Sequence, residues 1–226
     1  KAFIQVITND SSYYVNYDIE DFTFNHDPFY IQIADNFFSK ENIYINIKDI
    51  NQNLYINGNI EYSDSQNINT TLFNPNIMGP FSYIPFMECN HAILCMQSKV
   101  NGFITINDKK LEFDDGNGYI EKDWGYSFPK KYIWCQGNNF KNKNASFMIS
   151  VADIPFKLFH FTGFICTLLI DNKEYRFSTY NNAKIIKYDV SDNLLDIEIK
   201  KGTYTLKIKS KYANGLKLIA PVKGKM

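Results

Sequence analysis

The chain has 226 residues, enough for one large or two small β domains with a substantial hydrophobic core. Its 24 basic and 24 acidic side chains cancel, which argues against a nucleic-acid partner held through its phosphates. Aromatic residues make up 16% of the chain, and aromatic and β-branched residues favour strands over helices.

The four cysteines predict reduced thiols in an intracellular protein. They form no Cys-x-x-Cys pair, and Cys89 and Cys95 would lie about 20 Å apart on one extended strand, too far for a disulfide. The sequence shows no signal peptide and no apolar run that approaches the roughly 18 residues of a membrane-spanning helix. We therefore expect a cytoplasmic protein.

Short alternating segments separated by turn residues fill the first half of the chain. Strands are expected at residues 2–7, 13–17, 29–34, 43–50 and 53–62, with a β-bulge at Gly58. Residues 73–85 contain three prolines and a glycine, so this connection is neither a helix interior nor a central strand. A further strand is expected at residues 91–100, and a hairpin at residues 102–113 with its turn at Asn107.

The second half of the chain continues the same pattern. Its strands are expected at residues 145–152, 158–170, 174–180, 183–188, 194–200 and 203–209. Strands that recur every eight to twelve residues, with no stretch of helical period, predict an antiparallel all-β barrel or sandwich.

Residues 116–140 stand out because they combine large aromatic side chains with carboxylates and amides. We expect two strands there, one on either side of a Gly-Tyr-Ser-Phe-Pro turn. Since successive side chains of a strand point to opposite faces, Tyr119, Glu121 and Asp123 share one face of the first strand. One face of the second strand carries Tyr132, Trp134, Gln136 and Asn138. This mixture predicts the lining of a ligand pocket that contains a few polar groups.

The same residues carry a family likeness. The segments 118–129 (GYIEKDWGYSFP) and 132–140 (YIWCQGNNF) together resemble the core signature of the tocopherol cyclase family. Further matches flank them at residues 2–6, 74–81, 87–91, 154–156 and 220–224. The resemblance implies two lipocalin-like β-barrels or sandwiches in tandem, related to the carotenoid hydratase group, at residues 1–113 and 114–226. Longer family members are expected, so the chain is expected to be incomplete at both ends.

The resemblance also implies acid-initiated cyclisation, or hydration, of a prenylated hydrophobic substrate without a redox cofactor. Such a reaction needs a carboxyl group that stays protonated near neutral pH, and Glu121 and Asp123 could share a proton in this way. Four aromatic side chains are candidates to shield the carbocation: Tyr119, Trp124, Tyr132 and Trp134. Gln136, Asn138 or His91 could hold a phenolic head group by hydrogen bonds. Besides this small hydrophobic ligand, we expect a peripheral membrane contact for substrate uptake.

Less specific interpretations of these residues stay open. Glu121 and Asp123 could face solvent beside Lys122 and Lys130, and the two tryptophans could be ordinary core residues. No metal is expected, because the three histidines sit in no ligand-spacing motif: His26, His91 and His160. The alternative to an enzyme is a lipocalin-like carrier of an apolar or isoprenoid ligand, and a structural module is the third interpretation. The sequence leaves the oligomeric state open.

Overall fold

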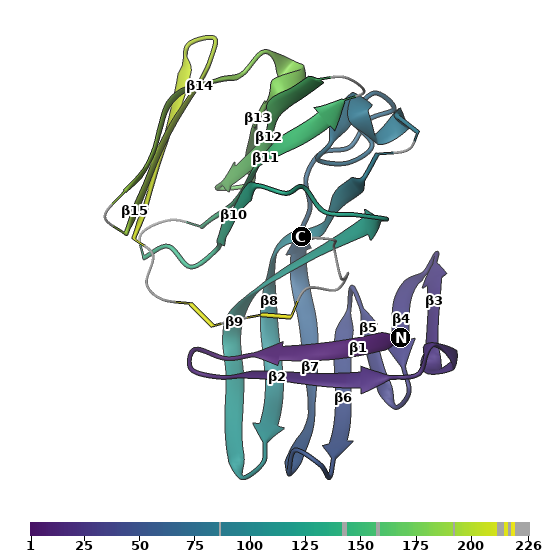
Figure 1. Cartoon of the computed structure of the whole chain (residues 1–226). Helices are drawn as coiled ribbons and strands as arrows, with labels where there is room; N and C mark the ends of the chain where they lie inside the picture. Colours follow the sequence, from purple (N-terminus) through teal and green to yellow (C-terminus); the bar gives the residue numbers. More distant parts are fainter. Residues whose placement is uncertain are drawn as a thin grey trace. The chain divides into compact units, whose positions relative to one another are not determined.

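The computed structural model describes residues 1–85, 87–141, 144–156, 159–191, 193–211, 215–216 and 218–219 (Figure 1). In these residues the secondary structure consists of sixteen β-strands and three 3₁₀ helices of three to five residues. No helix in these ranges is long and apolar enough to cross a membrane. The strands pair antiparallel, which confirms the predicted all-β, antiparallel fold class.

Two compact units make up the described chain. The first contains Lys1–Gln66, Gln97–Ile120 and Leu216–Ile219, and the second contains Asn67–Met96 and Glu121–Gly215. Compactness alone defines these units, so the assignment of residues 1–113 and 114–226 to two lipocalin-like domains stays a prediction.

The first unit combines a hairpin with a larger sheet. The hairpin consists of β1 (Ala2–Ile7) and β2 (Ser12–Tyr17), and Figure 1 shows it lying across the larger sheet. The short helix η1 (Ile19–Asp21) leads from β2 into that sheet. The sheet runs in chain order through β3 (Phe22–His26), β4 (Phe29–Ile33), β5 (Asn36–Ser39), β6 (Asn42–Asp49), β7 (Leu54–Gln66), β8 (Cys89–Ile106) and β9 (Lys109–Gly125). Residues 89–96 of β8 and 121–125 of β9 belong to the second unit.

Alternation of apolar and polar residues positions the core of the first unit. In β6, Ile45 and Ile47 are buried, whereas the residues on either side of Ile45 are exposed. The buried face of the sheet packs against the β1–β2 hairpin, which contributes Ala2, Ile4 and Val15 to the same cluster. Each fully buried isoleucine or leucine stabilises the folded state by roughly 1.5–3 kcal/mol.

Asparagine residues with positive φ close several of the tight turns. Asn53 (φ 48°) joins β6 to β7, and Asn107 (φ 51°) joins β8 to β9. Asparagine adopts this left-handed conformation more readily than most residues, because its short polar side chain can hydrogen-bond locally. The turn predicted at Asn107 is therefore confirmed.

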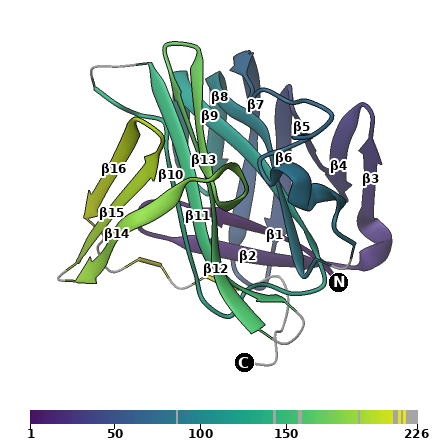
Figure 2. The same cartoon turned by 90° about the horizontal axis from the view of Figure 1, so that it is seen from above.

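The second unit is a sandwich of two sheets, seen side by side in Figure 2. One sheet consists of β10 (Tyr132–Gly137), β11 (Ala145–Phe156), β12 (Phe159–Ile170) and β13 (Lys173–Ser178). The other consists of β14 (Lys184–Ser191), β15 (Leu194–Lys201) and β16 (Tyr204–Lys211), and the unit also contains η2 (Gly79–Tyr83) and η3 (Thr179–Asn181). Neither sheet closes on itself in the described residues, so a sandwich and not a closed barrel describes this unit.

The β10–β13 sheet uses its two faces differently. One face carries Ile149 and Cys166, which pack against Ile197 of the other sheet in the core of the sandwich. The opposite face carries a row of cross-strand neighbours, in which Trp134 pairs with Ser150 and Ser150 pairs with Ile165. This second face is free of the core and forms part of a pocket.

Gly58 does not mark the predicted bulge. It pairs in continuous register with Ile45 on one side and Ile104 on the other. A Cβ atom at this position would lie 2.2 Å from the carbonyl oxygen of Phe103, so the close approach of β8 is what requires a glycine. The irregularity in β7 occurs later, between Ser63 and Gln66.

The substitution Gly58→Ala is expected to lower the free energy of unfolding by about 1–3 kcal/mol, because β7 and β8 would have to separate to admit the methyl group. Urea unfolding followed by circular dichroism measures this change. Gly116→Ala is the matched control, since a Cβ there meets its nearest neighbour at 3.5 Å and should change the stability little. Equal stability of the Gly58→Ala variant and the wild type would contradict the close approach.

Candidate functional site

A histidine lies between two carboxylates in the second unit. His91 comes from β8, and Glu121 and Asp123 come from the neighbouring strand β9, where their spacing of two places both side chains on one face. The imidazole Nδ1 lies 2.5 Å from Asp123 Oδ1, and Nε2 lies 3.2 Å from Glu121 Oε2. The two carboxylates therefore occupy opposite edges of one ring, and we call the three residues the histidine–carboxylate group.

Backbone contacts at the end of β9 hold this group in place. Glu88, just before β8, accepts hydrogen bonds through its carbonyl oxygen from the N–H groups of Tyr126 (3.0 Å) and Ser127 (3.1 Å). Gly125 lies between these segments with φ 154°, and a Cβ there would lie 2.1 Å from the same carbonyl oxygen. The glycine thus allows β9 to close tightly on the start of β8, next to the carboxylates.

The three members of the histidine–carboxylate group differ in exposure: His91 is buried, Glu121 is half-buried and Asp123 is exposed. The exposed fractions of its side chains are 11% for His91, 22% for Glu121 and 34% for Asp123. Burial by itself lowers the pKa of His91, but the hydrogen bonds and negative charges of Asp123 and Glu121 outweigh burial and raise this pKa to about 9. At neutral pH the imidazole is therefore protonated, with Nδ1 hydrogen-bonded to Asp123 and Nε2 at ion-pair distance from Glu121.

The histidine–carboxylate group forms part of the wall of a pocket of about 810 Å³. This volume lies in the range of small-molecule binding sites. Most of the remaining wall is apolar and comes from β11, β12, the segment after β9 and the segment before β8: it includes Met78, Phe81, Phe128, Ile154, Phe164 and Ile165. A charged group is thus exposed to a cavity that otherwise offers hydrophobic contacts.

Five of the nine site residues predicted from the sequence line this pocket: His91, Glu121, Asp123, Tyr132 and Trp134. The indole Nε1–H of Trp134 donates a hydrogen bond to Glu121 Oε2 at 3.3 Å. Tyr132 and Trp134 lie on the face of β10 opposite to Ile133 and Cys135, which pack against the sandwich core. Tyr132 and Trp134 were expected to share a face of their strand, and this shared face brings both aromatic rings to the pocket.

The other four predicted residues lie elsewhere in the structure. Tyr119 belongs to the first unit, and Trp124 lies on the face of β9 that also carries Lys122, whose Nζ is 5.0 Å from the centre of the indole ring. Gln136 is on β10 and Asn138 follows it, and neither lines the pocket. The binding roles of these four residues stay predictions.

The structure also adds pocket residues that the sequence patterns did not single out. Residues 73–85, interpreted only as a proline-rich connection, contribute Met78, Phe81 and Ile84 to the pocket wall. The Sδ atom of Met78 accepts a hydrogen bond from the backbone N–H of His91 at 3.0 Å. His91 itself was predicted, and β8, which carries it, is the neighbour of β9, which carries Asp123.

The histidine–carboxylate group has the residue types of a metal site. One ligand atom from each of its three residues lies within 4.8 Å of the others. A metal ion would need one unprotonated ring nitrogen of His91, so a protonated imidazole and a metal ion are alternative states of this group.

The pKa of His91 gives a direct test of this arrangement. Because it is raised from 6.5 to about 9, the resulting stabilisation of about 3 kcal/mol is complete below pH 6.5 and is lost as the pH rises through 9. The difference in unfolding free energy between wild type and His91→Gln should shrink accordingly between pH 6 and pH 10 in urea titrations.

Nuclear magnetic resonance of the imidazole nitrogens should show the same pKa in the wild type and a lower pKa for His91 in Asp123→Asn, which keeps the shape of the side chain but removes its charge. A wild-type value at or below 6.5 would contradict the ion pairs.

Comparison with known proteins relates the chain to one family. The chain is 33% identical over 75 residues to a chloroplastic tocopherol cyclase of Zea mays, and 32% identical over 75 residues to a probable chloroplastic tocopherol cyclase of Oryza sativa subsp. japonica. In each case the match covers 33% of this chain and only 16% of the relative. No solved structure matches the chain. The family model described as tocopherol cyclase-like matches residues 56–224, well over half of the sequence, and the chain therefore belongs to the tocopherol cyclase-like family.

Proposed function

We propose that the second unit binds a prenylated phenol or quinol in its pocket and cyclises it by acid catalysis at the histidine–carboxylate group. The observation that carries the proposal is a protonated imidazole, held by two carboxylates, in the wall of a largely apolar pocket of about 810 Å³. Membership of the tocopherol cyclase-like family and the printed names of the two plant relatives support the choice of reaction.

Ring closure of such a substrate consumes one proton and releases one. A proton adds to the less substituted carbon of the alkene, the phenol oxygen bonds to the resulting tertiary carbocation, and the phenol then loses its own proton. No electron is gained or lost overall, so the reaction needs a group that can both give and take a proton. In the proposed mechanism the imidazolium of His91, paired with Asp123 and Glu121, gives the proton to the alkene, and the neutral imidazole then takes the proton that the phenol loses.

The same residues can stabilise the carbocation. Together the two carboxylates and one imidazolium carry a net charge of −1, which favours positive charge nearby in a largely apolar pocket. The aromatic rings of Tyr132 and Trp134 line the same pocket, and each can contribute about 0.5–2 kcal/mol through its face. The sequence had suggested a proton shared between Glu121 and Asp123, whereas this mechanism routes the proton through His91.

A carrier of isoprenoid ligands is the competing proposal. An apolar pocket would suffice for it, and partly buried charges would then add only a desolvation cost. The histidine–carboxylate group therefore favours an enzyme over a carrier.

Neutralising both carboxylates tests the mechanism. In the double variant Glu121→Gln with Asp123→Asn, turnover of a prenylated benzoquinol is expected to fall by at least about 100-fold, because the proton is no longer held at the pocket. Binding of the same compound, measured by quenching of tryptophan fluorescence, should change much less, because the apolar wall is intact.

The matched control is Glu112→Gln with Asp114→Asn, which removes two exposed acids from the same strand and should leave turnover unchanged. Full activity of the Glu121/Asp123 double variant would exclude these carboxylates from the mechanism. Binding without any turnover in the wild type would favour the carrier.

The exposed rim of the pocket supports uptake of the substrate from a membrane surface. Tyr126 and Tyr132 line the pocket but remain 63% and 59% exposed, and Lys130 and Lys131 between them are also exposed. Aromatic rings beside lysines suit the interface of a bilayer that contains anionic lipids.

Tyr126→Ser with Phe128→Ser is therefore expected to reduce co-sedimentation with vesicles of phosphatidylcholine and phosphatidylserine severalfold, because it removes aromatic rings from the rim. Tyr188→Ser with Val190→Ser replaces two similarly exposed residues of β14 and should have no effect. Equal sedimentation of the two double variants would overturn the proposed contact.

A further inference from the structure

One wall of the pocket is built from a segment without strands. We call residues 67–85 and 87–88, which connect β7 to β8, the joining segment. It contributes six pocket residues: Met78, Phe81, Ile84, Pro85, Met87 and Glu88. Its regular structure in these residues is limited to η2 and a single bridge between Thr71 and Asn74. The position of this wall must therefore be set by contacts with the rest of the second unit.

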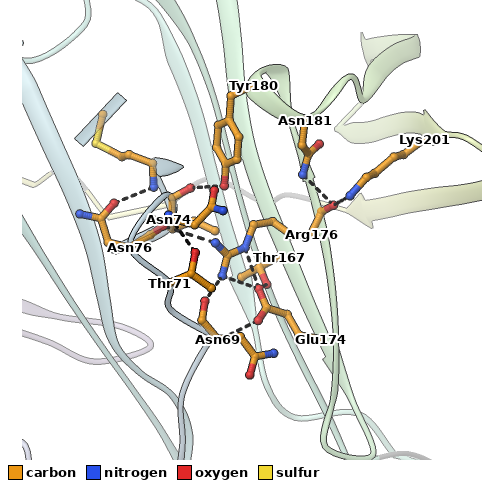
Figure 3. A network of polar contacts seen from close by, with 12 residues as sticks. Asn69, Thr71, Asn74, Asn76, Thr167, Glu174, Arg176, Tyr180, Asn181 and Lys201 are labelled. Carbon is orange, nitrogen blue, oxygen red and sulfur yellow. Dashed lines mark hydrogen bonds and ion pairs between the residues drawn. The ribbon is translucent and has the colours of Figure 1, made fainter. Parts of the chain in front are cut away.

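A buried ion pair on β13 forms hydrogen bonds with the backbone of the joining segment (Figure 3). Glu174 and Arg176 are 6% and 12% exposed, and Arg176 Nη2 lies 2.6 Å from Glu174 Oε1. Arg176 also donates from Nη2 to the carbonyl oxygen of Asn69 (2.7 Å) and from Nη1 to that of Asn76 (3.4 Å). Glu174 Oε2 in turn accepts the backbone N–H of Asn69 at 2.6 Å. The pair thus binds two points of the joining segment that are seven residues apart in sequence.

Only an arginine can make this set of contacts. Its guanidinium presents five donors in a fixed planar fork, whereas a lysine is a single compact charge. Arg176 is the one arginine of the chain, beside 23 lysines. The single use of arginine in a lysine-rich sequence coincides with a place where one side chain reaches a carboxylate and two separate carbonyl groups.

A second contact fixes the turn next to the pocket. The hydroxyl of Tyr180, on η3, donates to the carbonyl oxygen of Ile77 at 2.9 Å, and its ring packs edge-on against Phe81. Gly79 has φ 58°, and a Cβ there would lie 2.6 Å from the ring of Tyr180. The turn at residues 76–79 is therefore in close contact with the ring and hydroxyl of Tyr180.

Met78 connects these contacts to the histidine–carboxylate group. Met78 lies between Ile77, which Tyr180 holds, and Gly79, which touches the tyrosine ring. Met78 is buried, lines the pocket, and accepts the backbone N–H of His91 through its sulfur at 3.0 Å. Neither Arg176 nor Tyr180 lines the pocket itself.

We propose that Arg176 and Tyr180, with Glu174, are positioning residues that hold the joining segment against the sheet. They thereby determine the position of the pocket wall and of Met78, which covers the backbone N–H of His91. The role of these residues in catalysis rests on the proposed function, whereas their effect on the joining segment does not. Contacts between the substrate and this wall would depend on the positioning residues, whereas the protonation of His91 would not.

Two mild variants test the proposal without removing a buried charge. Arg176→Lys keeps the ion pair with Glu174 but cannot reach both carbonyl groups, and Tyr180→Phe keeps the ring but loses the hydrogen bond to Ile77. In each ligand-free variant, hydrogen exchange of the His91 backbone amide should accelerate by at least about tenfold, because Met78 no longer covers it continuously. The amide of Ile197, in the sandwich core, should exchange at the wild-type rate.

Kinetics with a prenylated benzoquinol give a second measurement. KM is expected to rise by about tenfold in both variants while kcat changes by less than about threefold, because the wall contributes to binding and not to proton transfer. Two controls in the same unit are matched in chemistry. Lys187→Met removes a lysine paired with the buried carboxylate of Asp196, and Tyr204→Phe removes a hydroxyl from β16. Neither should alter the His91 amide or KM.

The outcomes separate this proposal from the proposed function. Unchanged exchange at the His91 amide in both variants would overturn the positioning role, whatever the activity. An equal acceleration at Ile197 would also overturn it, because it would indicate general destabilisation. Faster exchange confined to His91, in a protein that cyclises nothing, would support the positioning role and count against the proposed reaction. A fall in kcat with constant KM would overturn the assignment of these residues to the binding wall.

Discussion

The proposed chemistry depends on a protonated imidazole flanked by two carboxylates at the edge of an apolar pocket. Each partner alone would be costly to bury, since a single charge loses its hydration without compensation. Together they compensate the charge of the imidazolium: Asp123 is hydrogen-bonded to Nδ1 of His91 at 2.5 Å, and Glu121 lies at ion-pair distance, 3.2 Å, from Nε2. The rest of the second unit can be understood as the framework that brings these three side chains together beside an apolar pocket.

That framework uses strand alternation twice. On β9, the spacing of two residues gives Glu121 and Asp123 a common face, and on β10 it gives Tyr132 and Trp134 another. The remaining wall cannot come from alternation, because the joining segment has no strands. Its place is fixed by polar side chains that reach across to its backbone, so the apolar wall of the pocket depends on a buried ion pair outside it.

Local patterns in the sequence predicted most of the strands and the residues that share a face. The alternation around Ile45 and Ile47 is visible in the sequence, and so is the asparagine turn at Asn107. His91 was harder to assign, because its partners are about thirty residues away and the predicted hairpin ended at residue 113. Extending both strands of that hairpin would have brought His91 near Asp123.

Other features could not be predicted, because they depend on contacts between distant segments. Gly58 looks like a bulge in one strand and is explained only by the carbonyl of Phe103 on the next. The proline-rich connection shows no periodic pattern, yet it forms a pocket wall. The sequence patterns did not single out Arg176. Its partners include the backbone carbonyl groups of Asn69 and Asn76, about a hundred residues earlier, which no side-chain pattern reveals.

The route of the chain through β8 and β9 has a consequence for how the protein can be divided. His91 precedes the Gln97–Ile120 stretch and the two acids follow it, although all three side chains belong to one unit. A fragment that starts at residue 114 would retain both tryptophans and both acids and still lack the base that joins them. The sequence signature and the histidine–carboxylate group are therefore separable in this chain: the recognisable motif stays in such a fragment, and the complete group does not.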